Sequence, residues 1–150
     1  MVEFKDLMRA LTAEAGLDEE PKGDDDGIHR VSYRDEAVCF QEVPELHRLY
    51  ISAKVGALPV EGADAFKTQM LKANFFGRDV SGGTLSLTND EEVHFHTSLD
   101  MIGLEGPDDF LSELELVLTV LDTWRKKIAD FRPDVADGTD SATDSGFLQV

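Results

Sequence analysis

Apolar residues recur with helical spacing in three segments of the chain. Phe4, Leu7 and Leu11 follow one another at steps of three and four residues, which predicts a helix over residues 2–16. A second stripe predicts a helix over residues 62–76, and its apolar members are Ala63, Phe66, Met70 and Ala73. The third and longest helix is expected over residues 108–131, with apolar residues at Phe110, Leu114, Val117, Leu121, Trp124, Ile128 and Phe131. Each helix therefore has an apolar face to bury.

Between the helices, apolar and polar residues alternate with the period of two that is typical of strands. This alternation predicts strands over residues 28–33, 37–43, 48–55, 84–88 and 92–99. A short polar turn separates the last two strands, which predicts an antiparallel hairpin. The order helix, three strands, helix, two strands, helix indicates an α+β fold with a mostly antiparallel, twisted sheet.

The length of the chain and its polar segments predict one folded domain and a tail. A chain of 150 residues can bury about 70% of its unfolded surface in one core, and we assign residues 1–132 to that domain. Residues 133–150 are rich in Asp, Gly, Ser and Thr and have few apolar side chains, so we expect an acidic disordered tail. Residues 18–26 hold six acidic residues and one lysine, which predicts a loop.

The charge of the chain excludes some classes of partner. Fourteen basic residues face thirty-one acidic ones, for a formal net charge of -17 and a pI near 4.4. Nucleic acid and anionic membrane surfaces attract basic proteins, so neither is expected as a partner. No apolar run reaches the roughly 20 residues that span a bilayer, so we expect no membrane insertion. A single cysteine allows no internal disulfide, and we expect a soluble cytoplasmic protein.

The residues that carry chemistry form no convincing catalytic pattern. His94 and His96 leave one face of a strand and could begin a metal site, but the local spacing marks no third ligand. Cys39 is interpreted as a small buried apolar residue rather than a nucleophile. What the sequence has in excess is apolar surface, at Phe75-Phe76, at Leu85 and Leu87 and on the third helix. Exposed apolar surface usually marks an interface, so either a well-filled core or a homodimer with grooves for a partner chain would account for it.

One stretch of the sequence resembles a known family. Residues 71–76 read Leu-Lys-Ala-Asn-Phe-Phe at the end of the second predicted helix, and Gly82-Gly83 then leads into a strand. This arrangement is similar to a hallmark of the class I type III secretion chaperones, the Tir chaperone family. The resemblance extends over residues 2–131 and is strongest over residues 63–128.

The resemblance implies a small α+β homodimer without enzymatic activity or cofactor. Such chaperones act in the bacterial cytoplasm, where they bind the N-terminal segment of a secreted effector protein in extended form. The effector is kept partly unfolded and is directed to the secretion machinery, which makes the secretion ATPase a further candidate partner. The client segment wraps the dimer, places apolar side chains in grooves and adds a strand to a sheet edge.

The resemblance also assigns residues to the two interfaces of the family. The positions that match its dimer contact are Phe66, Met70, Ala73, Phe75, Leu85 and Leu87. The positions that match its effector grooves are Phe4, Leu7, Met8, Leu11, Ile28, Val31, Val38, Phe40, Leu49 and Ile51.

Two other functions remain open from the residues alone. The acidic charge would suit an inhibitor or immunity-type protein that occupies a basic enzyme or a nucleic-acid-binding surface. A hydrolase that uses His94 and His96 with a metal is the third candidate.

Overall fold

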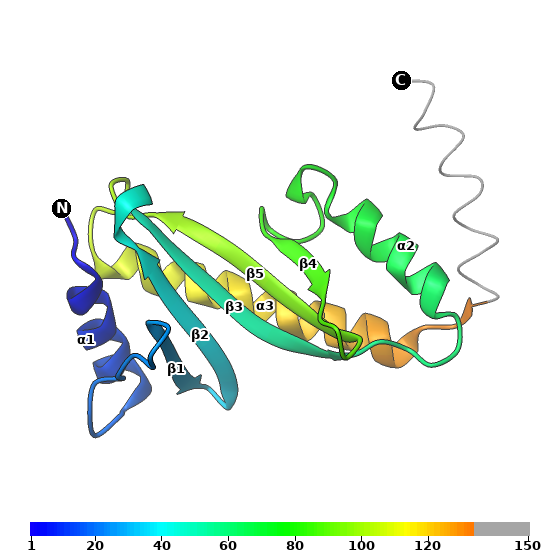
Figure 1. Ribbon diagram of the computed structural model, residues 1–150, viewed down its shortest axis with the longest axis horizontal. Coiled ribbons are helices and arrows are strands. Elements are labelled where there is room, and N and C mark those ends of the chain that lie inside the picture. Colours follow the sequence, from blue (N-terminus) through cyan, green and yellow to red (C-terminus); the bar gives the residue numbers. More distant parts are fainter. Residues whose placement is uncertain (134–150) are drawn as a thin grey trace.

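The computed structural model of the protein describes residues 1–133 and builds them around one five-stranded sheet (Figure 1). The strands are β1 (Ile28–Tyr33), β2 (Glu36–Val43), β3 (Arg48–Ala57), β4 (Thr84–Leu87) and β5 (Glu92–Asp100). They lie in the order β1-β2-β3-β5-β4, and every neighbouring pair is antiparallel. The helices are α1 (Phe4–Ala15), α2 (Ala63–Ala73) and α3 (Pro107–Asp130). The predicted α+β order is confirmed. Of the expected tail at 133–150, residues 134–150 lie outside the described residues.

The β1–β2 hairpin fixes which residues of the first strands face the core. Arg34 and Asp35 both have positive φ, at 50° and 65°, as a two-residue turn that matches strand twist requires. The turn places Tyr33 opposite Glu36 and Val31 opposite Val38. Val31, Tyr33, Val38 and Phe40 consequently point to one face, where all four are buried.

Helix α3 covers that face and supplies much of the core. It runs along the sheet and packs on β3 and β5, with α1 beside it at the β1 end (Figure 1). The ring of Phe110 meets Phe40 edge-on at 5.6 Å between centroids. At the other end of α3, Phe66 of α2 packs edge-on against Trp124 and Phe131. One continuous apolar core therefore joins all three helices to a single face of the sheet.

A charged side chain ties α3 to the middle of the sheet. The pairing of β3 with β5 shifts register between Lys54 and Gly56, which leaves a bulge. Arg125 donates from Nε to the Val55 carbonyl at 2.8 Å and from Nη2 to the Lys54 carbonyl at 2.7 Å. Its Nη1 also pairs with the Glu36 carboxylate on β2. Arg125 thus satisfies backbone acceptors that the bulge removes from the ladder.

The second helix is shorter than the sequence pattern predicts. It ends at Ala73 instead of residue 76, because the chain passes through Asn74 into a single 3-10 turn at Phe75–Gly77. Within that turn Phe76 has φ 53° and ψ 23°, a left-handed conformation that cannot continue a helix.

Replacing Arg125 by Met should destabilise the fold. The variant leaves the Val55 and Lys54 carbonyls and the Glu36 carboxylate without their donor, so we expect the free energy of unfolding to fall by about 2 kcal/mol. Urea denaturation of both proteins measures the change. Lys126→Met is the matched control. Within residues 1–133, Lys126 pairs with Asp122 alone, on the exposed side of the same helix, and such pairs contribute about 0.3–0.5 kcal/mol. Equal losses in the two variants would contradict the role assigned to Arg125.

Candidate functional site

The Leu-Lys-Ala-Asn-Phe-Phe motif joins the end of α2 to an edge of the sheet. The Asn74 side chain donates from Nδ2 to the Leu85 carbonyl at 2.9 Å and accepts from the Leu85 N–H at 2.8 Å. A side-chain amide thereby replaces a neighbouring strand at that point of β4. Only an amide has both a donor and an acceptor in this geometry, which explains the residue type.

The glycines after the motif are required by close packing. A Cβ added to Gly83 would lie 2.5 Å from the Phe95 ring and 2.7 Å from the His96 carbonyl oxygen. A Cβ on Gly77, which has φ +65°, would lie 2.6 Å from the Gly82 Cα. The turn can therefore bring β4 against β5 only because these positions lack a side chain.

Apolar side chains are exposed at the end of α2 and on the neighbouring edge strand β4. Leu71 is 72% exposed, Phe75 44% and Phe76 87%, and Leu87 on the neighbouring edge strand β4 is 37% exposed. The two phenylalanine rings contact each other at 4.5 Å between centroids. A bulky residue in the left-handed region costs about 1–2 kcal/mol, so Phe76 is held in a strained conformation that presents its ring to solvent. We call these four residues the α2–β4 patch.

The predicted dimer residues divide between the core and this patch. Phe66, Met70, Ala73 and Leu85 are buried within the single chain. Phe75 and Leu87 are exposed and belong to the patch. Leu71 and Phe76 were not in the predicted set. Leu71 lies on α2 but off its buried stripe, and Phe76 lies in the 3-10 turn that follows the helix. The apolar pair Phe75-Phe76 at the predicted helix end was the signal in the sequence.

The predicted effector-groove residues are mostly part of the monomer core. Eight of them are less than 5% exposed, and they are Leu7, Met8, Leu11, Val31, Val38, Phe40, Leu49 and Ile51. Phe4 and Ile28 are half-buried. Phe4 packs edge-on against His29, at 4.9 Å between ring centroids. The structure therefore encloses eight of these ten positions in the core, and only Phe4 and Ile28 have appreciable surface.

The face of the sheet opposite α3 has no helix on it among residues 1–133. Pairing aligns side chains across this open face, and one such row is Arg30, Cys39, Ser52, His96 and Thr84. A hollow of about 340 Å³ on the face is lined by Ile28, Ala37, Gln41, Tyr50 and His94, among others. Tyr50 is 39% exposed and is the largest exposed apolar group there.

The chemistry-bearing residues of the open face form no reactive centre. Cys39 was expected to be buried, and this is wrong: its side chain is half-buried on the open face, with the Arg30 Nη1 at 3.3 Å from its Sγ. His94 is half-buried and His96 exposed on the same face. Within residues 1–133, no three His, Cys, Asp or Glu side chains are placed to hold a metal ion.

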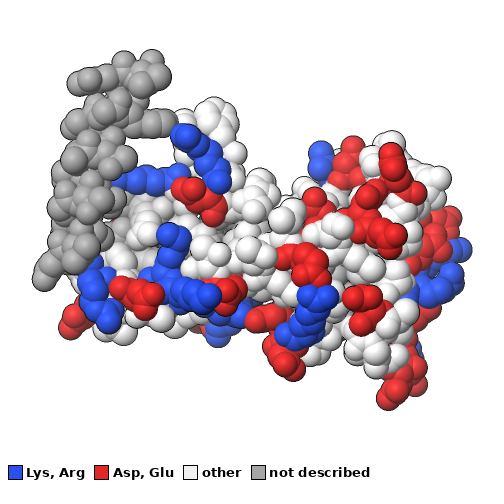
Figure 2. Space-filling model, turned by 180° about the vertical axis from the view of Figure 1, so that it is seen from behind, with Lys and Arg blue, Asp and Glu red and all other residues white. Residues whose placement is uncertain are grey.

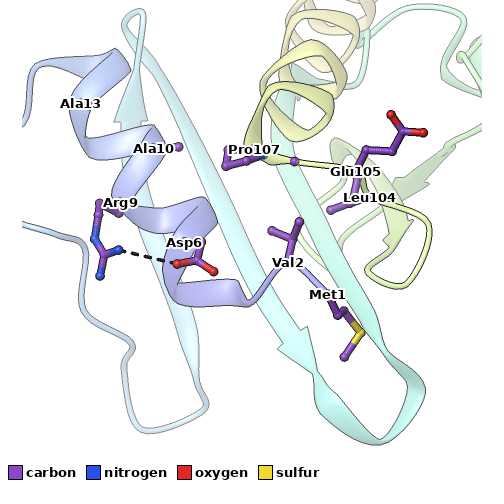
Figure 3. Close-up of a pocket in the computed structure, with 10 residues that line it drawn as sticks. Met1, Val2, Asp6, Arg9, Ala10, Ala13, Leu104, Glu105 and Pro107 are labelled. Carbon is purple, nitrogen blue, oxygen red and sulfur yellow. Dashed lines mark ion pairs between the residues drawn. The ribbon is translucent and has the colours of Figure 1, made fainter.

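A second hollow lies between α1 and the start of α3. Figure 3 shows Val2, Ala10, Leu104 and Pro107 around a cavity of about 670 Å³, with the Asp6–Arg9 ion pair at its border. Its lining is mostly small and apolar, so it could accept an apolar side chain of another polypeptide.

The negative charge is concentrated at the α1 end of the molecule. Residues 99–119 hold six acidic residues and no lysine or arginine, and residues 18–26 add six more against one lysine. Figure 2 shows the acidic side chains crowded at one end and lysines and arginines more frequent toward the other. The hollow between α1 and α3 thus lies in the acidic half.

Comparison with known proteins identifies the family. The model of the Tir chaperone protein (CesT) family matches residues 6–125. The chain belongs to the Tir chaperone protein family. The resemblance seen in the Leu-Lys-Ala-Asn-Phe-Phe motif is therefore confirmed. No curated protein matches this family member by sequence.

Solved structures of secretion chaperones share the fold of this Tir chaperone family protein. The ExsC–ExsE complex matches with a TM-score of 0.69 and 17% identity over 81% of this chain and 90% of that one. The HopA1–SchA chaperone–effector complex gives 0.65 and 17%, over 82% and 93%. The Yersinia pestis type III secretion chaperone SycH, solved with a fragment of YscM2, gives 0.61 and 19%, over 78% and 95%.

One further structural finding concerns membranes. None of the helices in residues 1–133 of this Tir chaperone family protein is both long enough and apolar enough to cross a bilayer.

Replacing Asn74 by Ala should loosen β4. The Leu85 N–H and carbonyl lose their partner in a partly buried position, so we expect a loss of about 2 kcal/mol in the free energy of unfolding. Hydrogen exchange at the Leu85 amide should become faster. Thr68→Ala on the exposed side of α2 removes one side-chain bond to the Asp64 carbonyl and serves as the control. An unchanged rate of hydrogen exchange at the Leu85 amide in Asn74→Ala would contradict the role assigned to the Asn74 side chain.

Proposed function

We propose that this protein is a homodimeric chaperone that binds the N-terminal segment of a type III secreted effector in extended form. The observation that carries the proposal is membership of the Tir chaperone family together with apolar surface left uncovered by the single chain. The chaperone would hold its client partly unfolded in the bacterial cytoplasm and deliver it to the secretion machinery, with the secretion ATPase as the receiving component. It would perform no catalysis and need no cofactor.

The α2–β4 patch is the proposed dimer contact. Its four apolar residues are all exposed on adjoining elements, and exposed apolar groups on soluble proteins mark interaction sites. The six residues assigned from the family would then act in two ways. Phe66, Met70, Ala73 and Leu85 shape the surface from within, while Phe75 and Leu87 contact the second copy.

The client is proposed to bind at the β1 end of the molecule. Strand addition needs a sheet edge with free backbone groups, and β4 has its edge occupied by Asn74 at Leu85. The other edge is β1. Next to β1 lie the open face with Ile28 and Tyr50 and the hollow between α1 and α3, which together would take apolar side chains of the client. In this proposal, the eight buried groove positions belong to the core that packs beneath these surfaces.

The acidic half of the molecule suits a basic client segment. Acidic side chains border both the hollow and the β1 edge, so lysines and arginines of a client would gain favourable contacts there. An inhibitor of a basic enzyme would also use these charges, but it would have no use for the uncovered apolar surface. The family match therefore supports the chaperone.

Replacing Phe76 by Gly separates dimer formation from folding. Glycine relieves the left-handed strain at φ 53°, so the stability of the single chain should stay the same or increase. Loss of the exposed ring should raise the dimer dissociation constant at least tenfold in sedimentation equilibrium. Val60→Gly removes another apolar side chain, 97% exposed and remote from the patch, and should leave the dimer unchanged. Even a weak dimer should form at a protein concentration of about 100 μM. A wild-type protein that is still monomeric at that concentration would overturn the assignment of the α2–β4 patch as the dimer contact.

Replacing Tyr50 by Glu tests client binding. The partner in the assay is the N-terminal segment of a type III secreted effector, co-expressed and purified with this protein, because a segment of low hydrophobicity is unfolded by itself. Wild type should form a stable complex in which the client segment exchanges its amides rapidly, and the association rate should fall with added salt.

Tyr50→Glu should weaken the complex at least tenfold, because a carboxylate replaces an apolar contact. Val60→Glu adds the same charge elsewhere and should bind normally. A complex with a folded client would favour the inhibitor.

A further inference from the structure

The acidic segment at residues 18–26 is more than a solvated loop. Gly23 forms an isolated antiparallel bridge with His29 of β1. The Asp24 N–H donates to the Ile28 carbonyl at 3.0 Å, and the Ile28 N–H donates to Asp24 Oδ1 at 2.9 Å. The segment is a loop, as its charge density predicted, but it contacts the start of β1 through this bridge and the two Asp24–Ile28 bonds.

These bonds show which backbone groups of β1 form the free edge. The N–H and the carbonyl of Ile28 both form hydrogen bonds with Asp24, so both groups point away from β2. Outward-pointing groups alternate along a strand in an antiparallel pair, so those of Arg30 and Ser32 point the same way. Among residues 1–133, Ser32 has no hydrogen-bond partner on that side. The edge is thus covered near Ile28 and open near Ser32.

A hollow marks the open part of the edge. It has a volume of about 490 Å³ and lies between Arg30, Val31 and Ser32 on one side and Leu17, Asp18, Glu19 and Pro21 on the other. An extended polypeptide could enter there and pair with Ser32, but it could not extend its pairing to Ile28 while Asp24 occupies that position.

We propose that residues 22–24 form a latch that covers the β1 edge and must be displaced when a client strand binds. This inference rests on the proposed function, because it assigns β1 as the acceptor of that strand. A client first pairs at Ser32 and then replaces the latch toward Ile28. Between clients the latch protects backbone groups that would otherwise pair with another chain.

Three features of the sequence fit a latch that opens. Gly23 approaches β1 so closely that a Cβ would lie 2.8 Å from the His29 ring, so a larger residue here would close against β1 only if that ring moved or was replaced. The six acidic residues of the segment repel one another, which keeps the closed form from becoming too stable. Lysines or arginines in a client would attract the same residues away from the edge. The closest basic group in β1, that of Arg30, is 4.0 Å from Asp24 and holds it only weakly.

Acid should loosen the latch. The Ile28 N–H bond to the Asp24 carboxylate lowers the pKa of Asp24 below its usual value near 3.8, with desolvation opposing and the Asp26 N–H, Arg30 and His29 adding to the lowering. A carboxyl whose pKa is lowered in the closed form stabilises that form at pH values above 3.8. The stabilisation is lost as pH falls through the lowered pKa.

A reversible disulfide tests whether the latch controls binding. Gly23 and His29 form the pair flanked by the Asp24–Ile28 bonds, and such a pair brings Cα atoms to about 4.5 Å, close enough for a disulfide. The variant is Gly23→Cys with His29→Cys in a Cys39→Ser background. The probe is a fluorescent ten-residue peptide of alternating valine and lysine, and the same protein is titrated oxidised and after reduction.

We expect the oxidised form to bind the probe at least tenfold more weakly than the reduced form. In the otherwise native chain, Asp24→Ala should bind the probe several-fold more tightly than wild type, and its Ile28 amide should exchange faster. Asp25→Ala removes the same charge from the next residue and should show neither change. Equal binding by oxidised and reduced protein would overturn the latch and leave the proposed function intact. No binding by any form would contradict strand addition at β1, and with it both proposals.

Discussion

Burial of apolar side chains on one face of the five-stranded sheet is the interaction on which the rest of the structure depends. All three helices join a single core on that face, with Phe40, Phe110 and Trp124 among its largest members. Arg125 fixes the position of α3 by binding the carbonyls of the bulge in β3. Because the helices of residues 1–133 cover only this face, the opposite face and the two edges of the sheet are left to be covered by other means.

The two edge strands of the sheet, β1 and β4, are covered in different ways. At β4 the Asn74 side chain takes both outward groups of Leu85 and belongs to the fold itself. At β1 the segment around Asp24 binds Ile28 from a stretch of chain with no apolar anchor of its own. The first contact is partly buried and the second is exposed, so the second is the easier one to break. This difference makes β1 the edge that suits exchange with another chain.

Charge and apolar surface are separated on the molecule. The α2–β4 patch lies on elements far from α1 (Figure 1), while the hollow between α1 and α3 lies at the α1 end, where acidic side chains are crowded (Figure 2). A strongly negative surface keeps copies of the protein apart in solution except where an apolar contact outweighs repulsion. The arrangement therefore allows self-association at one end and leaves the acidic end for a partner of opposite charge.

Local patterns in the sequence determined the elements, and the family motif determined the family. Periods of two and near 3.6 residues depend only on neighbours along the chain, so strands, helices and their order could be predicted from residues such as Phe4, Leu7 and Leu11. Burial could not, because the sequence cannot tell an apolar groove from an apolar core. Leu7, Phe40 and Ile51 matched the groove positions of the family but are enclosed within the single chain, whereas Phe76 is exposed because the backbone turns left-handed there. The pairing of Asp24 with Ile28 also required the tertiary structure, since charge density alone predicts repulsion, and only the path of the chain places that carboxylate at a strand edge.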